Sequence, residues 1–153
     1  MHNRITLEFL WWIATGMLML LILLPIYSSL NDSYPFYVPN ILFIVVFITL
    51  TRYIFLLKHT WFAYKEWVKV IFVFLPIPLL IYSTDALYDF QRFLDEDGTA
   101  AILGELTAEG QYKMAKYIRY QKLFFGTGAI LVEILFPFRM LVSLWRRRNR
   151  GTV

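Results

Sequence analysis

Cysteine is absent from the 153-residue chain. Without a thiol the protein forms no disulfide, no thiolate zinc site and no cysteine-held iron–sulfur cluster. Histidine is also scarce, because the sequence holds only His2 and His59. A haem bound between helices needs two axial ligands at matching depth, and His2 stands beside the first residue, so we interpret His59 as an interfacial side chain. We therefore expect no metal and no cofactor.

Catalytic motifs are missing as well. The chain has no glycine-rich phosphate loop, no GxSxG elbow, no HExxH and no pair of catalytic aspartates. The acidic run at 95–98 is similar to part of a calcium loop, but with Gly98 at the glycine position the first and last ligand positions fall on Phe93 and Gly104. We predict that the protein is not an enzyme.

Hydrophobic residues, by contrast, make up 59% of the chain and aromatic residues 19%, with a mean hydropathy of +0.56. This share exceeds that of an ordinary soluble domain. We therefore predict one integral membrane domain, 1–153, with an all-α fold: a bundle of four transmembrane helices. The formal net charge is +4, and the basic residues lie beside the apolar segments. We therefore attribute them to membrane orientation and to contacts with anionic lipid, and expect no nucleic-acid partner.

Four segments have the length and composition of membrane spans. They cover about residues 5–28, 41–57, 67–84 and 123–145. Pro76 and Pro78 interrupt the third, and because each removes a backbone donor we expect a kink there. The kink is either a structural bend or a broken helix that lines a substrate site.

The long polar segment, about residues 85–122, separates the third and fourth spans. Leu87, Phe90 and Leu94 repeat at helical spacing, which indicates a short amphipathic helix lying on the membrane. Neither proline nor glycine occurs between Gln111 and Phe125. We therefore expect a long helix that runs without interruption into the fourth span.

Lysine and arginine set the expected orientation. The two ends of the chain and the loop after the second span carry eight of them, against five in the polar segment. The positive-inside rule then places both termini in the cytoplasm and the polar segment outside it, in a multi-pass protein of the plasma or inner membrane. Four arginines form the basic tail at 146–153 and are predicted to be a topology anchor, with a specific anionic-lipid site as the alternative; they are Arg146, Arg147, Arg148 and Arg150.

Two opposite-charge pairs are candidates for a functional site. Glu133 in the fourth span and Arg52 in the second lie about equally deep, and a buried carboxylate in a membrane needs a partner. We predict a buried intramembrane ion pair between them, with a proton or ion relay and a contact to a partner subunit as alternatives. Glu8 and Arg139, both near the cytoplasmic face, form a weaker second pair.

These observations favour a non-catalytic subunit, or an assembly or scaffold factor, of a larger membrane complex. Its partners would be other membrane subunits or further copies of the chain, with anionic lipid at the cytoplasmic face. The alternative is a small oligomeric channel or transporter that uses Glu133, Arg52 and the break at Pro76 and Pro78. A membrane enzyme that uses Asp85, Asp89 or Glu133 is less favoured, because no acid, base and nucleophile converge.

Overall fold

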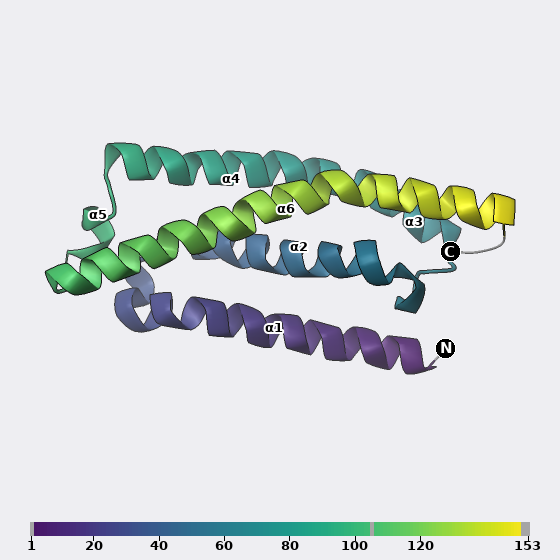
Figure 1. Ribbon diagram of the computed structural model, residues 1–153, viewed down its shortest axis with the longest axis horizontal. Helices are drawn as coiled ribbons and strands as arrows, with labels where there is room; N and C mark the ends of the chain where they lie inside the picture. Colours follow the sequence, from purple (N-terminus) through teal and green to yellow (C-terminus); the bar gives the residue numbers. More distant parts are fainter. Residues whose placement is uncertain (1, 105, 151–153) are drawn as a thin grey trace.

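The computed structural model describes residues 2–104 and 106–150, and within these ranges the chain is helical and has no strand. Four helices are long and apolar enough to cross a membrane, where α3 and α4 together count as one. The all-α, four-helix prediction is confirmed at this level (Figure 1). The elements are α1 (His2–Leu30), η1 (Asn31–Ser33), α2 (Tyr37–Leu56), η2 (Leu57–His59), α3 (Glu66–Phe74), α4 (Pro76–Glu96), α5 (Ala100–Leu103) and α6 (Ala108–Arg150).

The helices lie roughly along one axis (Figure 1). Helices α2 and α6 run side by side in the same direction, α1 flanks α2, and α3 with α4 lies along the other side of α6. The first residues of α1 and the last residues of α6 are at the same end of the bundle. Because α6 contacts both α2 and α4, it holds the two halves of the bundle together.

Helix α2 begins earlier than the sequence predicts. Its first residue is Tyr37, whereas the expected span begins at about residue 41, so Pro39 lies in the first turn of the helix. A proline is tolerated at this place, because the first N–H groups of a helix have no intrahelical acceptor. The amide of Asn40 already donates to the Phe36 carbonyl, at 3.1 Å.

The third span is interrupted at Leu75, between α3 and α4. Pro76 is the first residue of α4 and Pro78 lies in the same turn. Neither proline has an N–H group, so the carbonyls of Phe72 and Phe74 lack the donor that an uninterrupted helix would give them. Beyond this break α4 continues to Glu96 without a second interruption. The expectation of a separate helix from residue 85 is therefore wrong, because Ser83, Leu87 and Phe90 form one buried stripe in a single helix.

Helix α6 is 43 residues long and contains Pro137. The predicted continuous helix through 111–125 into the fourth span is confirmed. At 1.5 Å per residue its length is about 64 Å, roughly twice the thickness of a bilayer core. Two glycines let it approach α2: a Cβ at Gly128 would lie 2.8 Å from the Phe47 ring, and one at Gly126 3.2 Å from the Phe43 ring.

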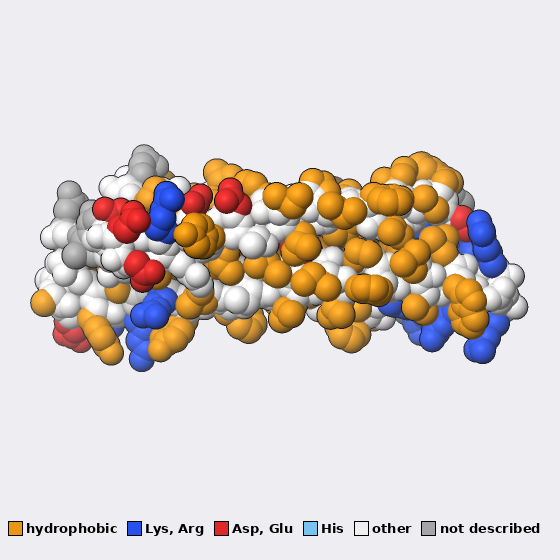
Figure 2. Space-filling model, turned by 90° about the horizontal axis from the view of Figure 1, so that it is seen from above, with side chains coloured by type: hydrophobic (Ala, Val, Ile, Leu, Met, Phe, Trp, Pro, Cys, Tyr) orange, Lys and Arg blue, Asp and Glu red, His pale blue; other side chains and the backbone are white. Residues whose placement is uncertain are grey.

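The surface is divided along the axis. Hydrophobic side chains cover the middle of the face seen in Figure 2, whereas charged side chains gather towards the two ends. Large apolar side chains are exposed on the outward faces of the long helices, among them Leu21, Ile81 and Leu131. This distribution is compatible with a bundle embedded in lipid.

Candidate functional site: polar contacts between the helices

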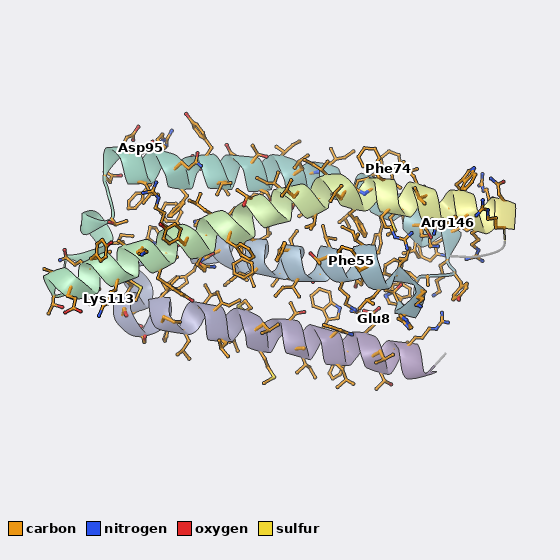
Figure 3. All side chains as sticks on the ribbon, viewed as in Figure 1. Glu8, Phe55, Phe74, Asp95, Lys113 and Arg146 are labelled. Carbon is orange, nitrogen blue, oxygen red and sulfur yellow. The ribbon has the colours of Figure 1, made fainter. Side chains whose placement is uncertain are left out.

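Arg52 forms its ion pair with Glu8, not with Glu133. Its Nη1 donates to Glu8 Oε2 at 2.7 Å, and the two side chains are only 7% and 9% exposed. The guanidinium also stacks over Trp11 and Tyr53, 5.2 and 5.4 Å from the ring centroids. The contact joins α1 to α2 near the end of the bundle where α1 begins (Figure 3).

The predicted pairing of Arg52 with Glu133 is wrong because the two side chains face different helices, although they lie at similar depths along the bundle. Two contacts show which residues of α2 and α6 lie side by side: Asn40 contacts Gln121, 81 positions later, and Ile54 contacts Arg139, 85 positions later. Adding the same separations to 52 places Arg52 level with residues 133–137 of α6. Arg52, however, faces α1, whereas Glu133 faces α4.

Glu133 is buried, with 1% of its surface exposed. Its Oε1 accepts a hydrogen bond from Ser83 Oγ at 2.8 Å, which joins α6 to α4. Its Oε2 has no hydrogen-bond partner among the described residues. The carboxyl group thus lies between α4 and α6, and within the part of the chain that the structure describes only one of its oxygens accepts a hydrogen bond, from the neutral hydroxyl of Ser83.

The second predicted pair, Glu8 with Arg139, is also wrong. Arg139 Nε donates to the backbone carbonyl of Ile54 at 2.9 Å. Ile54 lies in the last turn of α2, where carbonyl groups lack an intrahelical donor and the helix dipole favours a positive charge. Arg139 therefore caps α2, while Glu8 is taken by Arg52.

Two further contacts join α3 to α6. The buried Lys69 donates from Nζ to Ser143 Oγ at 2.7 Å, and Arg147 Nε lies 3.2 Å from Glu66 Oε1. Sequence reasoning missed both, although Arg139, Ser143 and Arg147 recur at four-residue spacing on α6, which places them on one face. Of the predicted anchor residues, Arg146, Arg148 and Arg150 are exposed at the end of α6, and Arg147 is the one that faces another helix.

At the other end of the bundle two buried amides form a closed pair. Asn40 on α2 and Gln121 on α6 each donate to the other's side-chain oxygen at 2.9 Å. Tyr117 Oη donates to the Ile22 carbonyl at 2.7 Å, which joins α6 to α1. The sequence signal for the amide pair was available, because both residues stand at the start of an apolar stretch.

Lys122 is buried beside three aromatic rings. Its Nζ lies 4.0 Å from the centroid of Phe36, 4.4 Å from that of Phe90 and 5.9 Å from that of Tyr34. Such contacts stabilise a cation, and Nζ has no hydrogen-bond acceptor among the described residues. Burial, with a smaller contribution from Tyr37, raises the pKa of the Tyr34 phenol above its ordinary value.

The residues considered for metals stand apart from these contacts. His59 is exposed, and the side chain of His2 lies outside the described residues. Gly98 has a φ of 69°, which suits a turn after α4. Among the side chains that the structure describes, no three from His, Asp or Glu are grouped so that they could hold a metal ion.

In comparisons with protein-family models, with curated proteins and with solved structures, the chain gives no match.

Proposed function

We propose that the protein is a non-catalytic integral membrane subunit, or an assembly or scaffold factor, of a larger membrane complex. It would cross the plasma or inner membrane four times, with both termini cytoplasmic. The observation that carries the proposal is that polar side chains buried between the helices contact one another within the chain. They tie α1 to α2, α4 to α6, α3 to α6 and α2 to α6.

The break at Leu75 supports the same proposal. A cavity of about 250 Å³ adjoins it, and its walls are almost entirely apolar, with Trp12, Thr49, Phe72 and Leu79 among them. Neither Arg52 nor Glu133 lines this cavity. A bend between packed helices explains these surroundings better than a solute path, which needs polar groups along its walls.

Helix α1 supplies the surface on which we expect a partner. Of the residues in its most apolar stretch, 17% are buried inside the molecule, against 39% for α2. Leu21 and Leu24, 70% and 64% exposed, lie on its outward face. As an edge helix, α1 leaves most of its apolar surface for lipid or for a partner helix.

Mild detergent extraction followed by mass spectrometry tests the proposal. We expect different membrane proteins to co-purify in fixed stoichiometry, and a photoreactive residue at Leu21 to cross-link to one of them. The matched position is Ile81, which is 68% exposed on α4, on the far side of the bundle. A homogeneous homo-oligomer that moves a solute after reconstitution would contradict the proposal.

A small channel or transporter is the second candidate, and the unpartnered Oε2 of Glu133 favours it. Glu133→Gln separates the two, because glutamine keeps an acceptor for Ser83 Oγ but cannot carry a charge. Under our proposal this variant assembles and co-purifies like the wild type. Normal assembly with complete loss of solute flux would favour the transporter.

A further inference from the structure

A polar cavity lies where the end of α4 and the beginning of α6 diverge. Its volume is about 650 Å³, and the turn that contains Gly98 and Thr99 closes one side. Figure 3 shows the two helix ends apart, with Asp95 on α4 and Lys113 on α6. The α6 wall carries polar side chains that recur at helical spacing and so share one face: Tyr112, Lys116, Arg119 and Tyr120.

Opposite charges face this cavity from its two walls without meeting. Among the described residues, neither Lys116 nor Arg119 forms an ion pair, and Asp95 on the α4 wall forms none either. Nearby charges are paired within their own helices: Arg92 lies 4.0 Å from Glu96, and Lys113 lies 2.6 Å from Glu109. Lys116 Nζ lies 5.8 Å from the centroid of the Tyr120 ring, but none of the three groups has an opposite charge among the described residues as its partner, which leaves them available to a charged ligand.

This arrangement fits a zwitterion. Two cations on one wall suit a phosphate, because Arg and Lys bind phosphate oxygens through charge-assisted hydrogen bonds. A single carboxylate on the opposite wall suits a primary ammonium group. A ligand that carries both groups would neutralise both walls at once.

The position of the cavity favours a membrane lipid. Leu94, Ala115 and Leu123 add apolar side chains to its lining, and Leu123 is where α6 passes from its polar part into its apolar part. Tyr112 and Tyr120 at its rim are 70% and 62% exposed, as is typical of aromatic side chains at the headgroup level.

We propose that this cavity binds a phosphoethanolamine group, with the phosphate on Lys116 and Arg119 and the ammonium on Asp95. The cavity is at the end of the bundle opposite the basic tail. Its assignment to a lipid rests on the membrane location proposed above, but not on the role as a subunit. The group comes either from phosphatidylethanolamine in the surrounding leaflet or from a free phosphoethanolamine ester.

Binding to defined lipids tests the site. Purified protein is exchanged into detergent with phosphatidylethanolamine or phosphatidylglycerol, and the retained lipid is measured by native mass spectrometry. We expect wild type to retain the ethanolamine lipid preferentially. Arg119→Gln should lower the affinity for both lipids about tenfold, as expected for the loss of a charge-assisted hydrogen bond. Asp95→Asn should lower the affinity for phosphatidylethanolamine only, and so abolish the preference for it over phosphatidylglycerol.

Lys113→Gln is the matched control, because Lys113 lies on the same helix but pairs with Glu109 and does not line the cavity. Equal retention of the two lipids by wild type, or identical behaviour of Arg119→Gln, Asp95→Asn and Lys113→Gln, would overturn the proposal. A titration with glycerophosphoethanolamine identifies the source. Binding of this soluble ester at the affinity of the lipid indicates a free ligand, whereas binding of the lipid alone indicates the membrane, and binding of neither overturns the site.

Discussion

Arg52 on α2 and Glu8 on α1 form a buried ion pair, 2.7 Å from Nη1 to Oε2, although 44 positions separate them in the sequence. Within the described residues it is the salt bridge with the least exposed side chains. The pair ties the edge helix α1 to α2, beside the apolar contacts that Leu23, Ile26 and Leu30 make with the core.

Removing one member of this pair should destabilise the bundle strongly. Arg52→Gln leaves the Glu8 carboxylate buried and unpaired, which costs about 3–5 kcal/mol for a buried pair. The free energy of unfolding can be measured by titration with a denaturing detergent. We expect Glu8→Gln combined with Arg52→Gln to cost less than the sum of the single changes. Strict additivity would show that the two side chains do not interact, and Arg148→Gln, at an exposed position, is the control.

Gly128 should tolerate no side chain. A Cβ there would lie 2.8 Å from the Phe47 ring, so Gly128→Ala forces α2 and α6 apart and should cost about 1–3 kcal/mol, as overpacking does. Gly16 on α1 is the matched control, because a Cβ there meets nothing within 4 Å. Thermal unfolding followed by tryptophan fluorescence should show a lower midpoint for Gly128→Ala and an unchanged or higher one for Gly16→Ala. Equal midpoints would contradict the close contact of α6 with Phe47.

The amide pair gives a third prediction. Asn40→Leu leaves Gln121 buried without its partner, which costs about 1–3 kcal/mol. Replacing both residues with leucine removes both polar groups, so the double variant should recover most of the stability. The unfolding free energies of the two single variants and the double variant measure the coupling. A double variant less stable than either single one would show that these amides do not depend on each other.

The sequence predicted the helices better than it predicted which neighbouring helix each polar side chain faces. Hydrophobic length is a property of each segment alone, so the four long apolar helices and the continuous α6 were accessible from it. Ser83, Leu87, Phe90 and Leu94 also follow one helical spacing on both sides of residue 85. This unbroken spacing was the signal that α4 would not end there. The start of α2 was missed because the expected span begins at about residue 41, after Pro39, although a proline fits the first turn of a helix.

The partners of the charged residues were not accessible in the same way. Counting residues gives a depth along the bundle, and Arg52 and Glu133 do lie at similar depths. Which neighbour a side chain faces depends on how each helix is rotated about its axis, and packing against several helices at once sets that rotation. The aromatic surroundings of Lys122 show the same limit, because Phe36 and Phe90 come from a loop and from another helix. No local pattern connects them.

The arrangement of the polar interior can be measured directly, because the natural chain has no cysteine and introduced pairs report without background. A disulfide would not span the gap left by the two long side chains, so a short bismaleimide is used to cross-link two double variants in native membranes: Glu8→Cys with Arg52→Cys, and Arg52→Cys with Glu133→Cys. Mass spectrometry of proteolytic fragments detects the cross-link. Our account predicts an efficient cross-link in the first variant and none in the second, because Arg52 faces α1 and Glu133 faces α4. A cross-link between positions 52 and 133, with none between 8 and 52, would contradict it.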